Sequence, residues 1–156
     1  MNVNENIERL RERVGHEVGV SPWILIDQGD VNQHAETTGD TEWFTTDEAR
    51  TASAATFDTT IVPGFLLLSQ LTRMSRALEL PIENAAYLLN YGFDRVRIVQ
   101  PVPVGTRVQG RFELTGVSPK GHHGLLIHLD TSIWMADDDI APATVAEWLV
   151  YARIND

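Results

Sequence analysis

One apolar segment, residues 60–80, limits the possible folds more than any other part of the chain. It opens with Pro63-Gly64, a pair typical of a helix start, and apolar side chains then recur at helical spacings. Those side chains are Phe65, Leu66, Leu67, Leu68, Leu71, Met74 and Leu78. A helix that is apolar nearly all round its first two turns has to be enclosed by other structure. We therefore predict a central buried helix at about 63–79, with its charged C-terminal end reaching water.

Strand patterns follow that helix for the rest of the chain. Residues 85–102 alternate but are interrupted by Gly92, which indicates a kinked or bulged strand. Three longer alternating stretches, at 107–119, 125–136 and 143–154, are joined by short turns, as in an antiparallel meander. With a short apolar strand at 23–26, about five strands are available to wrap one helix. The predicted fold class is α+β, a hot-dog fold in which a curved antiparallel sheet encloses the helix.

The first quarter of the chain is expected to hold two further helices. Residues 1–14 have an amphipathic pattern, and 15–22 read as a loop. A helix at 28–37 should begin after Asp27, with Asp30 completing a capping-box-like pair. Its buried face is expected to hold Val31, His34 and Ala35. A length of 156 residues suits one domain, so we treat 1–156 as a single unit.

Composition excludes several classes of function. The formal net charge of −10 argues against nucleic acid and anionic membranes as partners, although an acid-rich proteome would also explain it. The chain has no cysteine, which excludes disulfides and thiolate metal ligands and fits a cytoplasmic protein. The His, Asp and Glu residues show no metal-binding spacing, so no metal is expected. The N-terminus lacks the apolar core of a signal peptide, and no apolar run is long enough to span a membrane.

The most informative motif lies between the second helix and the central one. Residues 35–47, AETTGDTEWFTTD, resemble the MaoC-like dehydratase and (R)-specific enoyl-CoA hydratase family. They are most similar to its nodulation protein N-like branch, whose pattern runs Ala-x-x-Thr-Gly-Asp-x-x-Trp-Ile-His-x-Asp. Stretches at 60–66, 89–97 and 145–150 fit the same branch in order and spacing. The resemblance therefore spans about residue 15 to the end.

The resemblance implies hydration of an enoyl thioester, or the reverse dehydration of a 3-hydroxyacyl thioester. Asp40 matches the family's acid–base Asp, and the backbone N–H of Gly64 matches its oxyanion donor. The family's catalytic His falls on Thr45, which can hydrogen-bond a water but cannot transfer a proton near neutral pH. The position before the helix-start Gly is often His in the family and is Pro63 here. Substrate contacts are expected from Pro63, Phe65, Asn90 and Trp43.

Each of these positions has a simpler alternative. Asp40 would also suit a loop residue that caps the turn at 41–44, and Thr45 would suit an ordinary turn. Asn90 would serve in structural hydrogen bonding, and Trp43 in the core. Residues 29–34 resemble the Gly-Asp-x-Asn-Pro-x-His signature of enoyl-CoA hydratases but lack the Pro and one residue of spacing. We therefore expect His34 to be a packing residue.

The expected partners follow from the same resemblance. No cofactor is expected beyond the coenzyme A or carrier protein that bears the acyl group, and hot-dog proteins commonly pair edge to edge as homodimers. The missing His leaves two other functions open. One is a diverged hot-dog protein that binds an acyl or other apolar ligand, or acts as a cyclase, isomerase or thioesterase. The other is an inactive subunit of a heterodimer.

Overall fold

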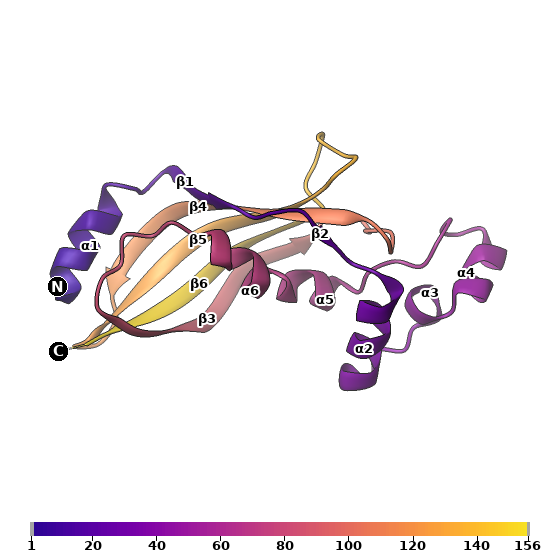
Figure 1. Ribbon diagram of the computed structural model, residues 1–156, viewed down its shortest axis with the longest axis horizontal. Helices are drawn as coiled ribbons and strands as arrows, with labels where there is room; N and C mark the ends of the chain where they lie inside the picture. The colour runs from indigo at the N-terminus through magenta and orange to yellow at the C-terminus, as the bar shows by residue number, and fades with distance from the viewer. Residues whose placement is uncertain (1, 156) are drawn as a thin grey trace.

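A computed structural model describes residues 2–155, which form one antiparallel sheet of six strands (Figure 1). The spatial order is β1-β4-β5-β6-β3, and β2 also pairs with β4. The strands are β1 (His16–Val20), β2 (Ile24–Leu25), β3 (Ala85–Ile98), β4 (Arg107–Pro119), β5 (Gly124–Met135) and β6 (Thr144–Ile154). The expected number of about five strands is thus exceeded by one, because β1 forms where a loop was expected.

The meander predicted for the last third of the chain is confirmed. β4 pairs with β5 and β5 with β6, so consecutive strands are neighbours in the sheet. Phe112 and Leu114 are buried, whereas Arg111 and Glu113, which alternate with them along β4, are exposed. This alternation gives the sheet one apolar face and one polar face.

The central helix lies on the apolar face and is divided into three short pieces. They are α5 (Gly64–Ser69), α6 (Leu71–Met74) and the 3-10 turn η1 (Ser75–Ala77). Leu66, Leu67, Leu71 and Met74 are at most 7% exposed. Met74 presses so closely on β4 that a Cβ at Gly110 would lie 2.7 Å from its sulfur. The expected burial on all sides is wrong for Phe65, which is 78% exposed because the sheet covers only one side of the helix.

The remaining helices occupy the two ends of the sheet (Figure 1). At one end α1 (Val3–Arg11) packs against β4. At the other end lie α2 (Gln28–Thr38), α3 (Trp43–Thr46) and α4 (Glu48–Ala54). The predicted capping box of α2 is confirmed, since Asp27 and Asp30 each accept a hydrogen bond from the other's backbone N–H.

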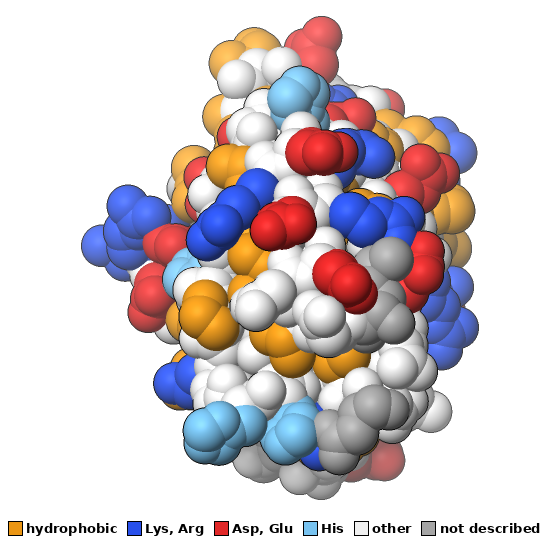
Figure 2. Space-filling model, turned by 90° about the vertical axis from the view of Figure 1, so that its left-hand side faces the viewer, with side chains coloured by type: hydrophobic (Ala, Val, Ile, Leu, Met, Phe, Trp, Pro, Cys, Tyr) orange, Lys and Arg blue, Asp and Glu red, His pale blue; other side chains and the backbone are white. Residues whose placement is uncertain are grey.

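A curved antiparallel sheet with a central helical segment packed on its apolar face is the predicted hot-dog arrangement. Within residues 2–155, no helix is both long and apolar enough to cross a membrane. The end of the molecule that carries α1 shows acidic and basic side chains interspersed, without a field of one sign (Figure 2). An ion pair between Arg9 and Glu83 belongs to this mixed surface.

Candidate functional site

A hollow of about 410 Å³ opens at the start of α5. Residues 39–47 (the motif loop), α5 and the end of β3 meet there. Asp40, Thr45, Pro63 and Gly64 line it, so four predicted site residues lie in one place. Most of its other walls are apolar: Phe44, Ile61, Val62, Leu67, Ile98, Val99, Pro101 and Val102. A mostly apolar hollow with a few converging polar groups is the usual form of a small-molecule site.

Asp40 is placed by the end of α2. Gly39 adopts a left-handed conformation with φ 78°, and its N–H donates to the Ala35 carbonyl at 2.8 Å. This C-cap ends the helix and turns the chain, so that Asp40 comes back toward the helix it follows. The alternative role of Asp40 as a turn cap is wrong. The N-cap of α3 is Glu42, and within residues 2–155 the Asp40 carboxylate accepts no hydrogen bond.

The Asp40 carboxylate has a neighbour that the motif does not include. His34 Nε2 lies 3.9 Å from Asp40 Oδ2, and the two side chains are 13% and 35% exposed. The expectation that His34 only packs on the buried face of α2 is therefore incomplete. Val31 and Ala35 form that face, while the partly exposed imidazole reaches the carboxylate. An imidazole and a carboxylate at this distance attract each other when the imidazole is protonated.

Thr45 is buried and its polar groups are engaged locally. Its hydroxyl donates to the Glu42 carbonyl at 2.8 Å, inside the single turn of α3. Its own carbonyl accepts a hydrogen bond from Gln28 Nε2 at 2.8 Å, and Gln28 Oε1 accepts one from the Thr60 hydroxyl at 2.6 Å. The sequence does not indicate that Gln28 and Thr60 contribute to the site, because single polar residues in separate segments form no pattern. Together they tie the motif loop to α2 and to the segment before α5.

Gly64 is the first residue of α5, directly after the N-cap Pro63. The first N–H groups of a helix have no partner within it, so the Gly64 N–H can serve a ligand. The glycine also has a packing reason. A Cβ at this position would lie 3.0 Å from Ile98 Cγ1, which is closer than side chains normally approach.

The structure does not bring the other three predicted contact residues into this hollow. Phe65 is exposed, and Trp43 is half-buried with the Arg50 guanidinium 4.8 Å from its ring centre. Asn90 lines a separate, mostly apolar hollow of about 510 Å³ between the end of the central helix and strands β3 and β6. The order of residues along the sequence did not reveal that β3 passes two different hollows.

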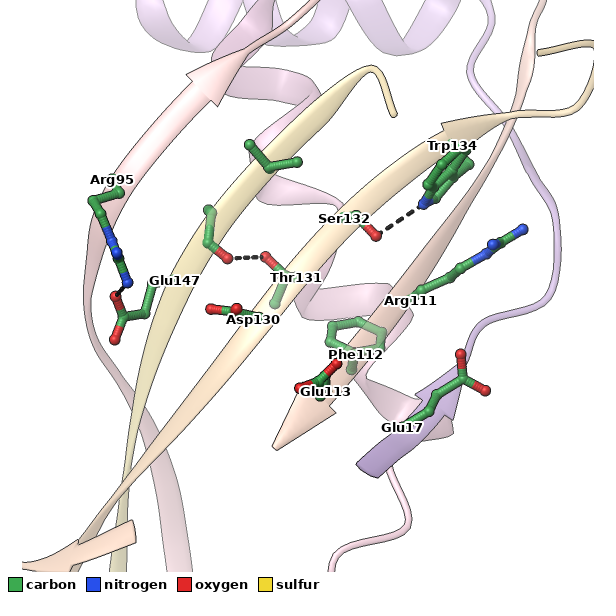
Figure 3. Close-up of a pocket in the computed structure, with 12 residues that line it drawn as sticks. Glu17, Arg95, Arg111, Phe112, Glu113, Asp130, Thr131, Ser132, Trp134 and Glu147 are labelled. Carbon is green, nitrogen blue, oxygen red and sulfur yellow. Dashed lines mark hydrogen bonds and ion pairs between the residues drawn. The ribbon is translucent and has the colours of Figure 1, made fainter. Parts of the chain in front are cut away.

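A third hollow, of about 470 Å³, lies on the polar face of the sheet and is lined by charged side chains (Figure 3). Arg95 donates a hydrogen bond to Glu147 there. That bond holds the pKa of the Glu147 carboxyl below its ordinary value, and it raises the pKa of the Arg95 guanidinium. Because this face points away from the central helix, the hollow is separate from the one at Gly64. Among residues 2–155, no three His, Asp or Glu side chains gather as a metal ion would require.

Comparison with known proteins identifies relatives over nearly the whole chain. The 3-hydroxyacyl-thioester dehydratase Z of Mycobacterium tuberculosis is 35% identical over 150 residues, which cover 96% of this chain and 97% of that protein. Nodulation protein N of Rhizobium meliloti is 34% identical over 142 residues, covering 91% and 88% of the two chains.

Solved structures show the same fold at lower identity. A MaoC-like dehydratase from Rhodospirillum rubrum superposes with a TM-score of 0.72 at 13% identity, covering 92% of this chain and 94% of that one. The (R)-hydratase from A. caviae gives a TM-score of 0.67 at 23% identity, covering 90% and 98%. The family model described as "MaoC like domain" matches residues 9–130. With this match and relatives that span nearly its full length, the chain belongs to the MaoC-like domain family.

Proposed function

We propose that the protein is a hydratase or dehydratase that interconverts a trans-2-enoyl thioester and its 3-hydroxyacyl counterpart. The observation that carries this proposal is that Asp40 and Gly64 line the same hollow. Adding water across an enoyl thioester needs a base for the water and a hydrogen-bond donor for the thioester oxygen. Relatives at 34–35% identity include a protein named 3-hydroxyacyl-thioester dehydratase, which supports the same reaction class.

Asp40 and Gly64 suffice for a balanced reaction. The Asp40 carboxylate accepts a proton from water as the water oxygen bonds to C3 of the substrate. The electron pair of the C2–C3 double bond shifts to form a C1–C2 double bond, and the carbonyl electron pair moves onto the thioester oxygen, where the Gly64 N–H stabilises the enolate. The protonated Asp40 then donates its proton to C2, which restores both the carbonyl and the carboxylate. Dehydration is the same sequence in reverse.

The hollow suits such a substrate in other respects. Its largely apolar walls favour an acyl segment over a charged one, and Thr45 can still offer a lone pair to the attacking water. We propose no cofactor beyond coenzyme A or a carrier protein as the bearer of the acyl group. Pro63 is retained as a substrate contact because it lines the hollow beside Gly64.

We further propose a homodimer that forms along β3. This strand of 14 residues stands at the edge of the sheet, and Tyr87, Leu88, Leu89 and Tyr91 on it are each about half exposed. A long, apolar, unpaired edge is a template for pairing with a second strand. We propose the cytoplasm as the location, which fits a chain that has no cysteine and therefore no disulfide.

The test is hydration of trans-2-enoyl-CoA substrates of increasing chain length, followed by the loss of the conjugated absorbance. We expect turnover that depends linearly on the concentration of purified protein. The matched control is the Asp58→Asn variant, which changes an exposed Asp outside the hollow and should turn over normally. Absence of turnover at high protein concentration for every chain length would reject the proposal for coenzyme A thioesters.

A second candidate is supported by Thr45, whose hydroxyl proton is already donated to Glu42. A chain without the motif His would bind an acyl ligand without turning it over, or would depend on a different subunit for catalysis. Tight binding of a 3-hydroxyacyl-CoA by calorimetry, together with no turnover, would favour this candidate.

A further inference from the structure

We propose that His34 is the imidazole that positions Asp40, in place of the histidine that the motif lacks at Thr45. The proposal rests on the proposed hydratase function and assigns one more residue to the same site. Its basis is the approach of His34 Nε2 to within 3.9 Å of Asp40 Oδ2. His34 does not line the hollow, so it acts through the carboxylate and does not contact the substrate.

The backbone between His34 and Asp40 brings the two side chains close to each other. His34 lies in the C-terminal half of α2, and its carbonyl accepts a hydrogen bond from the Thr38 hydroxyl at 2.7 Å. Gly39 then reverses the chain in the left-handed conformation, and the Asp40 N–H donates to that same Thr38 hydroxyl at 3.3 Å. Thr38 thus connects both residues of the pair, and the carboxylate is held beside the last turns of its own helix.

No other imidazole of the described chain can take this part. His16 lies on β1 at the far side of the sheet order from β3, and His122 and His123 lie at the turn between β4 and β5. His128 Nδ1 lies 3.6 Å from Glu147 Oε1, on the polar face of the sheet. None of these four residues lines the hollow at Gly64.

The two oxygens of the Asp40 carboxylate have different roles in this proposal. His34 Nε2 lies nearest to Oδ2. In the proposed arrangement the imidazole closes on Oδ2 and restrains the rotation of the carboxylate, which leaves Oδ1 to receive the proton of the water. A fixed general base matters because misplacing a reacting group by about 1 Å costs on the order of 100-fold in rate. The 3.9 Å separation requires a closure of about 1 Å to become a charge-assisted hydrogen bond.

Activity measurements on His34 variants test the proposal. In the His34→Ala variant we expect kcat to fall about 10- to 100-fold with KM nearly unchanged, because the substrate does not touch the imidazole. His34→Gln keeps a donor of similar reach and should retain more activity than His34→Ala. The control is Gln33→Ala, a neighbouring exposed position on α2, which should leave both constants unchanged.

Rescue from the other side of the carboxylate separates positioning from a structural role. Adding Thr45→His to the His34→Ala variant should restore much of the lost kcat, because Thr45 lines the same hollow as Asp40. A variant that had merely lost packing in α2 would gain nothing from an imidazole at position 45. Unchanged kcat in His34→Ala, or loss of kcat without rescue in a folded double variant, would overturn the proposal.

A double-mutant cycle tests the pair even if the protein turns over none of the substrates. His34→Ala, Asp40→Ala and the double variant are compared by urea denaturation at low salt, which leaves the attraction between the side chains unscreened. We expect the two single effects on the denaturation midpoint to be non-additive. Additive effects would overturn the His34 assignment whatever the activity, whereas absent turnover with a coupled pair would reject only the hydratase function.

Discussion

The Thr45 hydroxyl donates a hydrogen bond to the Glu42 carbonyl oxygen at 2.8 Å, within the turn that follows Asp40. This contact makes Thr45 a structural residue of the motif loop as well as a wall of the hollow. We expect Thr45→Val, which keeps the shape and removes the hydroxyl, to lower the free energy of unfolding by about 1 kcal/mol. Chemical denaturation measures this change. Equal stability of the variant and the parent would show that the hydrogen bond contributes nothing.

Gly64 combines a packing role with a proposed catalytic one, and the two can be separated. The added methyl group of Gly64→Ala would press on Ile98, and we expect a stability loss of about 1–3 kcal/mol together with a loss of kcat/KM. Because alanine keeps the backbone N–H that is proposed to hold the thioester oxygen, removing the clash with Ile98→Ala in the same variant should recover part of both the stability and the activity. Recovered stability without any recovered activity would contradict the proposal that Gly64 acts through its backbone N–H.

The edge strand offers a test of assembly. Leu89 on β3 and Leu25 on β2 are 54% and 53% exposed, so they form a matched pair. We expect Leu89→Lys to shift the protein from dimer to monomer in light scattering, because a charge would be buried in the proposed interface. Leu25→Lys is the control and should stay dimeric. A monomeric parent protein would contradict the proposed homodimer directly.

Glu147 makes the free energy of unfolding depend on pH. Its pKa is lowered in the folded state by the hydrogen bond from Arg95, so its contribution to stability is present above the pKa of an unfolded glutamate, about 4.3. That contribution is lost as pH falls through the lower folded value. Urea denaturation of the parent and the Glu147→Gln variant should therefore differ more at neutral pH than in acid. A difference that grows in acid would contradict the sign of this shift.

Much of the fold was predictable because periodicity reports burial on one face of an element. The central helix and the β4–β6 meander follow from that rule. β1 does not, because it is short, contains Gly19 and pairs with β4 through an irregular register. The glycine is required by close packing, since a Cβ there would lie 2.7 Å from the Ala77 carbonyl oxygen. In a sequence without a structure, a glycine at such a position indicates a loop.

The candidate site was predictable only as far as its motif. Asp40, Thr45 and Gly64 come from two segments that resemble the same family. That resemblance predicted that the three residues belong to one site. The approach of His34 to Asp40 has no such signal, because a separation of six residues matches no helical spacing. It depends on the left-handed turn at Gly39. The sequence indicates a turn at this glycine but does not predict the direction in which the chain continues.

In the proposed mechanism, Asp40 carries the proton of the reaction. The direct measurement is kcat/KM of Asp40→Asn for the best enoyl-CoA substrate, beside the Asp58→Asn control, with both proteins shown to be folded. We expect Asp40→Asn to lose about 100-fold or more, as removal of a general acid–base group typically does, and the control to lose nothing. Activity of Asp40→Asn equal to that of the control would remove Asp40 from the mechanism and contradict the proposal.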